Sequence, residues 1–277
     1  MTILNRKIDF AVVFSVRNAN PNGDPLNGNR PRLTYDGFGE VSDVCLKRKI
    51  RNRLQDFGCP IFVQSDDRKV DGFKSLRDRA DSIPEIKTAK DPDVIHDVAC
   101  KTWIDVRSFG QVFAFKGDTL SVGIRGPVSI HPAFSVHPID VTSIQITKSV
   151  SSVPSNTRAS DTMGMKHRVD FGAYVFYGSI NPQLAEKTGF SVDDADKIRK
   201  ALIELFENDA SSARPEGSME VHRVYWWEHQ NKLGQYPSAK VHRSLTVTPK
   251  VDRPKSMDDI EINLTRLDGL DVEVYGD

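Results

Sequence analysis

The sequence IDFAVVFSVRNANPNGDPLNGNRPR, residues 8–32, joins an apolar run to a long polar loop, and SDVCLKRKIRNRLQDF follows at residues 42–57. The apolar residues 8–16 predict a buried first strand. Asn and Gly tolerate positive φ and Pro fixes φ, so the loop can be ordered without a core of its own. After it, apolar positions recur at helical spacing and predict an amphipathic helix: Leu46, Ile50, Leu54 and Phe57.

Basic residues fill the predicted helix between its apolar positions, with no acid among them. They are Lys47, Arg48, Lys49, Arg51 and Arg53. A solvated helix face is the plainer interpretation, but solvated faces usually mix charges of both signs. The Asn side chains and free backbone N–H groups of the preceding loop suit phosphate and ribose oxygens. The combination favours a nucleic-acid backbone as partner, with the basic side chains at the surface.

The composition is that of a soluble globular protein with segregated charge. The chain has 277 residues, of which 38% are hydrophobic and 27% charged, and its formal net charge is zero. Zero net charge argues against a protein that coats duplex DNA by bulk charge. Residues 47–53 are nevertheless basic and residues 258–277 mostly acidic, so one surface can bind RNA and another a neighbouring copy.

The cysteines and the N-terminus indicate a cytoplasmic protein. Cys45, Cys59 and Cys100 lack C-x-x-C spacing, as expected for free thiols in a reducing compartment. No signal peptide is recognisable, and the first apolar run is too short to cross a membrane. We therefore expect no membrane partner.

The middle of the chain predicts an insertion followed by β structure. Residues 59–101 are charged and broken by prolines, which predicts short helices outside the core. Residues 103–115 and 121–139 carry β-like apolar patterns. Residues 140–168 predict a protruding β-hairpin with a polar tip, although a long disordered loop would have a similar composition.

The last third supplies the second half of an α+β fold. Residues 169–180 form the most aromatic predicted strand, and Ser191 begins a helix with a capping box. Residues 220–228 and 241–247 predict two more strands. The order strand, helix, strands, hairpin, strand, helix, strand corresponds to a ferredoxin-like βαββαβ layout with large insertions. Both helices should pack on one face of the sheet.

No catalytic, metal or cofactor motif is present in the sequence. It lacks the P-loop, the Rossmann glycines, H-E-x-x-H and G-x-S-x-G. His222 and His229 lie an odd number of residues apart in one predicted strand, so they face opposite sides. Asp24 and Asp36 could serve as a base or hold Mg²⁺, but such residues in an Asn/Gly/Pro-rich loop usually form turns.

Several motifs in order resemble the CRISPR-associated Cascade backbone subunit, a member of the RAMP superfamily. They are NPNGDP at 20–25, VCLKRKIR at 44–51, DVRSFG at 105–110, RGPV at 125–128, MGMKH at 163–167, FEND at 206–209 and WWEH at 226–229. The set is similar to the type I-C version, and the type I-B subunit shares the first loop. The resemblance spans nearly the whole chain.

The resemblance implies one elaborated domain, residues 1–277, shaped like a hand. It has an RRM-like palm, a finger insertion at residues 58–102 and a thumb hairpin at residues 140–168. Several copies, with other Cascade subunits, would assemble along the CRISPR RNA. The guide would then pair with a target DNA strand, so that base pairing reads the sequence and the protein reads the backbone.

The resemblance also implies an RNA-binding surface made by the first loop, the basic helix, the palm and the thumb, without a cofactor. Its candidate residues are Asn20, Asn22, Arg30, Lys47, Arg48, Lys49, Arg51, Arg53, Arg107, Arg125, Arg158, Met163, Met165, Lys166 and His167. The methionines could wedge against a base, since the side chain is flexible and polarizable.

Three functions follow, of which a non-catalytic RNA-binding assembly protein is the leading hypothesis. The alternative is a RAMP-type endoribonuclease acting on CRISPR RNA or target RNA, because some RAMP relatives cut RNA. Such an enzyme would need a placed acid or histidine, for which Asp24, Asp36 and His167 are the candidates. A scaffold that binds only protein is disfavoured by the unbroken basic stretch at residues 47–53.

Overall fold

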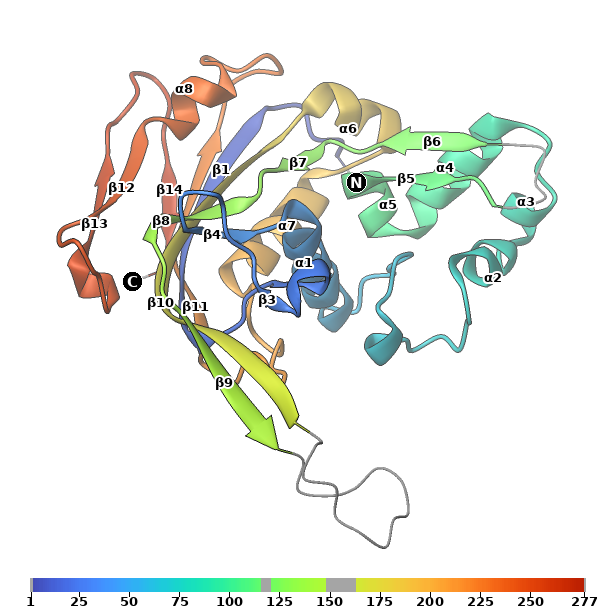
Figure 1. Cartoon of the computed structure of the whole chain (residues 1–277). Coiled ribbons are helices and arrows are strands. Elements are labelled where there is room, and N and C mark those ends of the chain that lie inside the picture. Colours follow the sequence, from blue (N-terminus) through green and yellow to red (C-terminus); the bar gives the residue numbers. More distant parts are fainter. Residues whose placement is uncertain (1, 116–120, 148–162, 277) are drawn as a thin grey trace, which may run out of the picture.

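The structure is a computed structural model, and it describes residues 2–115, 121–147 and 163–276. Within them, an antiparallel sheet of eight strands forms the centre, in the order β14-β11-β1-β10-β8-β4, with β7 and β9 also paired to β10 (Figure 1). The strands are β1 (Ile8–Ala19), β4 (Phe38–Val41), β7 (Val128–Ile130), β8 (Ala133–Pro138), β9 (Val141–Thr147), β10 (Met163–Ile180), β11 (Met219–Glu228) and β14 (Glu273–Tyr275).

Strand β1 is the predicted first strand, and it lies inside the sheet with both faces covered. It pairs with β10, where Ile8 opposes Ile180, and with β11. Phe10 and Phe14 enter the main core, whereas Val13 enters a second core on the opposite face. Burial on both faces explains why residues 8–16 form a continuous apolar run instead of an alternating one.

Helices α1 (Asp43–Asp56) and α7 (Val192–Ile203) cover one face of the sheet, as the sequence predicted (Figure 1). Leu46, Ile50 and Leu54 of α1 are fully buried in the main core with Leu202 of α7. The predicted capping box at Ser191 is confirmed, because the Ser191 and Asp194 side chains each accept a backbone N–H of the other residue.

The opposite face of the sheet is covered by α8 (Ser238–His242), β12 (Leu245–Pro249), η3 (Met257–Asp259) and β13 (Ile260–Leu264). The predicted strand at residues 241–247 is therefore wrong in its first half. Val241 reaches the second core from a short helix, and a single buried apolar residue does not distinguish a helix from a strand. No helix in the described part of the chain has the length and apolarity to span a membrane.

The insertion lies beside the sheet and has its own small core of Phe62, Trp103, Phe113 and neighbours (Figure 1). Its elements are η2 (Asp66–Arg68), α2 (Leu76–Asp81), α3 (Pro84–Lys87), α4 (Pro92–Thr102), α5 (Ile104–Phe109), β5 (Gly110–Phe113) and β6 (Val122–Arg125). The expected short helices are confirmed.

The strand expected from residue 103 is wrong up to residue 109. That segment forms α5, in which the buried Asp105 carboxylate accepts the backbone N–H groups of Phe62 and Val63. Gly110, at φ 81°, ends the helix and begins β5.

Strands β9 and β10 form a hairpin that extends away from the sheet (Figure 1). Their register runs from Val141 opposite Val169 to Thr147 opposite Met163. The hairpin strand and the aromatic strand, expected as two segments, form one strand of 18 residues. The predicted polar tip, including Arg158, lies outside the described residues.

Candidate nucleic-acid interface

The polar loop after β1 is ordered by its own asparagines and contains β2 (Gly23–Asp24), η1 (Pro25–Asn27) and β3 (Arg30–Pro31). The buried Asn20 amide donates to the carbonyl of Asn29 at 2.7 Å. Asn22 Oδ1 accepts the backbone N–H of Ser42 at 3.0 Å and its hydroxyl at 2.9 Å. Both predicted RNA-binding side chains are therefore engaged in fixing the loop against the start of α1.

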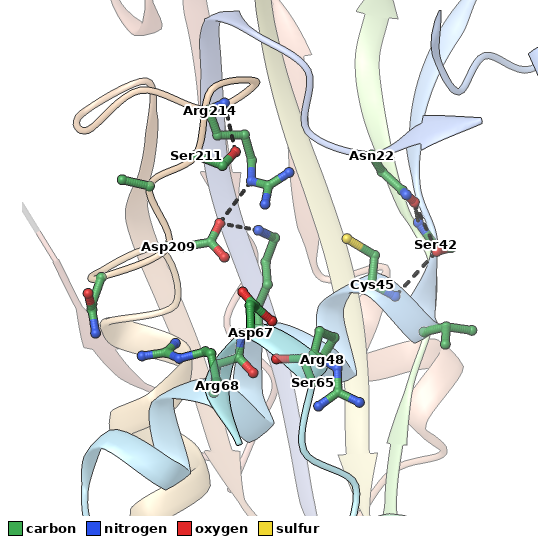
Figure 2. Close-up of a pocket in the computed structure, with 15 residues that line it drawn as sticks. Asn22, Ser42, Cys45, Arg48, Ser65, Asp67, Arg68, Asp209, Ser211 and Arg214 are labelled. Carbon is green, nitrogen blue, oxygen red and sulfur yellow. Dashed lines mark hydrogen bonds and ion pairs between the residues drawn. The ribbon is translucent and has the colours of Figure 1, made fainter. Parts of the chain in front are cut away.

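A groove of about 610 Å³ lies between α1, the segment around η2 and the loop that follows α7 (Figure 2). Four basic side chains line it, Arg48, Lys49, Arg68 and Arg214, with the carboxylates Asp67 and Asp209. The remaining polar lining consists of amides and hydroxyls: Asn22, Ser42, Asn52, Ser65, Asn208 and Ser211. Excess positive charge with many small donors suits an anionic, oxygen-rich ligand.

Lys49 is the largest departure from the sequence interpretation. Its side chain is 3% exposed, and Nζ forms an ion pair with Asp209 beside the Phe206 ring, whose centroid is 5.5 Å away. Burial lowers the pKa of Lys49, and the charge of Asp209 opposes that shift. The expectation that Lys49 is a surface position is wrong, because the loop after α7 covers it.

The other helix bases also have acidic partners, two from distant sequence and two at the ends of α1. Arg51 Nε contacts Asp105 at 2.9 Å, and Arg53 pairs with Glu204 and with Asp56. Lys47 pairs with Asp43 at 3.0 Å. The basic stretch is therefore not free of acids in the folded protein, since Asp105 and Glu204 from distant sequence, and Asp43 and Asp56 from the ends of α1, pair with it.

Arg48 is the exception on this helix. Its Nη1 donates to the backbone carbonyl of Val63 at 2.6 Å, and none of the described carboxylates lies within ion-pair distance of it. Burial and the nearby Arg51 lower the pKa of Arg48. Arg68 Nη2 contacts Asp56 at 2.6 Å and lines the same groove. These side chains and Arg214 are the basic groups that the groove presents.

Arg107 and Arg125, which were expected at the palm surface, both lie in the insertion, in α5 and β6, and they differ in environment. Arg107 forms a two-point ion pair with Asp194, at 2.9 and 2.7 Å, so it joins the insertion to α7. Arg125 is exposed in β6, opposite Gly110. A Cβ on Gly110 would lie 2.2 Å from the Ile124 carbonyl oxygen, so this glycine permits the approach of the protein's own backbone.

The hairpin presents exposed side chains on both faces. Met163 and Met165, each 56% exposed, alternate with Gly164 and share a face with His167, whose Nδ1 lies 2.8 Å from the Ser143 hydroxyl. Lys166 is exposed on the other face. Arg30, in β3, is partly exposed.

The enzymatic candidates do not form a group. Asp24 accepts the backbone N–H of Leu26 at 3.2 Å and pairs with Arg32, in the role of a turn former. Three or more metal-ligating side chains do not come together anywhere in residues 2–115, 121–147 or 163–276.

A buried charge cluster went unnoticed in the sequence. Asp9, the second residue of the first strand, contacts His229 at 2.8 Å, Lys7 at 3.2 Å and His242 at 3.6 Å. Burial raises the pKa of Asp9, but the hydrogen bond with His229, the nearby His242 and the charge of Lys7 outweigh it and hold the pKa well below its usual range. Asp9 and His229 are both fully buried, so removal of either would leave the other without its partner inside the protein.

Comparison with known proteins identifies the relatives. The family model described as CRISPR-associated protein Cas7 matches residues 6–265. A CRISPR-associated protein Cas7 from Haloferax volcanii is 29% identical over 234 residues, which cover 76% of this chain and 67% of that protein.

Solved structures give two further similarities. A chain of a CRISPR RNA-guided surveillance complex in a pre-nicking state has a TM-score of 0.50 and 19% identity, over 80% of this chain and 75% of the other. A second chain, from a CRISPR RNA-guided surveillance complex, has a TM-score of 0.46 and 17% identity, over 80% of this chain and 68% of the other.

Proposed function

Because the chain belongs to the Cas7 family of CRISPR-associated proteins, we propose that it is an RNA-binding backbone subunit of a CRISPR RNA-guided surveillance complex. Its ligand is the CRISPR RNA, which it holds by the phosphate backbone. Copies of the chain assemble along the guide with other subunits of the complex, and the guide pairs with the target DNA strand.

The observation that carries this proposal is the groove at α1. Arg48, Arg68 and Arg214 line it together with amides and hydroxyls. A guanidinium presents a planar set of donors that matches two phosphate oxygens at once, and it stays charged at any physiological pH. Contacts of this kind hold any guide equally well, as a backbone subunit requires.

The architecture that we propose is the hand shape of a palm, a finger and a thumb. The strand order β11-β1-β10-β8, with α1 and α7 on one face, supports a ferredoxin-like palm. The insertion with its separate core supports a finger, which extends past the expected residues 58–102 to include α5, β5 and β6. The projecting β9–β10 hairpin supports a thumb within residues 140–168. On this proposal residues 1–277 are one elaborated domain, and Met163 and Met165 on the thumb meet bases of the guide.

Two finer assignments belong to the same proposal. The order of motifs favours the type I-C subunit over the type I-B subunit. We also propose that the chain is not an enzyme: the alternative RAMP-type endoribonuclease would need an acid or base held near the RNA, and Asp24 is engaged in capping η1.

The test is co-expression of the chain with a CRISPR array and partner subunits, followed by extraction of RNA from the purified complex. The proposal expects RNA of one defined length bound to several copies of the chain. A complex that assembles without RNA, or a chain that purifies with random cellular RNA only, would overturn it.

A further inference from the structure

Lys49, Asp209 and Arg214 form a cluster, here called the shared-carboxylate cluster, at one wall of the groove (Figure 2). Lys49 Nζ and Arg214 Nε both contact the same atom, Oδ2 of Asp209, and the arginine contact is 3.1 Å long. The Lys49 side chain is 3% exposed and the Arg214 side chain 27%. One carboxylate thus holds one buried cation and one cation that solvent reaches.

The Arg214 side chain can leave Asp209 without a change in the backbone, because the backbone is held by its own hydrogen bonds. Its N–H donates to the Ser211 carbonyl at 3.0 Å, and the Ser211 N–H donates to its carbonyl at 2.8 Å. Its guanidinium uses only Nε on Asp209, and the two terminal nitrogens make no hydrogen bond to the described residues. An arginine with this free edge can take a phosphate by rotating its side chain.

Lys49 cannot make the same move. It projects from α1 under the loop that follows α7 and lies against the Phe206 ring. A buried ammonium separated from its carboxylate loses several kcal/mol of compensation, so Lys49 stays on Asp209 in any folded state.

We propose that Asp209 is a shared counterion: Arg214 exchanges from Asp209 to an RNA phosphate, while Lys49 remains as the partner that neutralises the carboxylate. Without Lys49, departure of Arg214 would leave a poorly solvated carboxylate beside an incoming phosphate. Lys49 is then a positioning residue, which enables a phosphate contact that it does not itself make. This inference rests on the proposed function, because it assigns roles within the RNA groove.

The test is a salt titration of affinity for a labelled single-stranded RNA of mixed sequence, with thermal melts of each variant. On single strands log K falls as log salt rises, and each lost phosphate contact makes this slope shallower by about 0.7. Arg214→Gln should make the slope shallower by about 0.7, and Lys49→Met should do the same, because Asp209 then retains Arg214. Lys49→Met added to Arg214→Gln should make it no shallower.

The decisive variant is the double substitution Lys49→Met with Asp209→Asn, which removes the lysine and the carboxylate together. It leaves Arg214 free, so it should restore the wild-type slope although Lys49 is absent. If the double variant folds but its salt slope stays shallower than that of wild type by one contact, Lys49 touches the RNA itself and the inference is wrong. A folded Lys49→Met variant with an unchanged slope also overturns it.

Failure of the proposed function looks different. A wild-type chain whose RNA affinity does not depend on salt would overturn RNA binding by the groove, and the exchange with it. Wild-type binding with the expected slope, but without rescue in the double variant, would overturn only the shared counterion.

Discussion

Arg107 of α5 and Asp194 in the first turn of α7 form a two-point ion pair, with contacts of 2.9 and 2.7 Å, that joins the insertion to α7. Asp194 is 1% exposed and also serves the capping box of α7. The pair fixes the insertion at the end of the helix layer where α7 begins.

Arg107→Ala should therefore destabilise the protein. Removing one partner of a buried pair leaves the other charge uncompensated, at a cost of about 3 kcal/mol. Urea unfolding of the variant checks this. The control is Arg125→Ala, an exposed arginine whose loss should change stability by no more than about 0.5 kcal/mol. Equal stability of the two variants would contradict the structural role of Arg107.

Acid should weaken the fold partly through Asp9. Its pKa is lowered in the folded protein, so unfolding takes up a proton and stability falls as pH falls. The contribution is complete above the ordinary value of 3.8 and is lost progressively below it. Asp9→Asn should be less stable at neutral pH by about 3 kcal/mol, and its stability should change less between neutral and acidic pH.

Unfolding curves across that pH range, for wild type and variant, measure the difference. A constant gap between the two proteins down to the lowest pH would mean that the Asp9 charge adds nothing to stability.

The hairpin methionines should matter for assembly but not for folding. Met163→Ala and Met165→Ala change exposed positions, so stability should stay within about 0.5 kcal/mol of wild type. Guide-bound assemblies, sized by native mass spectrometry, should become shorter or heterogeneous. Leu233→Ala, at an exposed position away from the hairpin, is the control and should assemble normally. Normal assemblies from the methionine variants would exclude these residues from the role that we propose for the β9–β10 hairpin.

On the proposal that the chain is not an enzyme, we expect no specific RNA cleavage; Asp24, one of the candidates, caps η1 and pairs with Arg32. Purified protein is incubated with CRISPR precursor RNA, with and without Mg²⁺, and the products are sized. Defined products that disappear in Asp24→Ala or His167→Ala would establish the ribonuclease alternative.

The sequence predicted the elements whose pattern is local. The apolar run of β1, the apolar stripe of α1 and the capping box at Ser191 need no information from the rest of the chain. The wrong predictions are also local. The segments around Val241 and at residues 103–109 are brief apolar stretches that fit either a helix or a strand, and tertiary contacts determine that both are helical.

The site was harder to predict than the fold because its charges pair over long distances. Lys49 and Asp209 are 160 positions apart in the chain, and Arg53 and Glu204 are 151 apart. The basic residues 47–53 lie on α1, which lines the groove, but the sequence pattern could not separate Arg48 from the paired bases beside it. That distinction required the folded positions of the acids.

The most direct test of the account is the salt dependence of RNA affinity in Arg48→Gln, Arg68→Gln and Arg214→Gln. The matched control is Arg243→Gln, exposed just past α8 on the opposite face of the sheet. In each groove variant, log K should fall less steeply with log salt, by about 0.7 in the slope, and equally for unrelated guide sequences. The control should leave the slope unchanged. Folded groove variants that all keep the wild-type slope would contradict the account and place the RNA path elsewhere on the molecule.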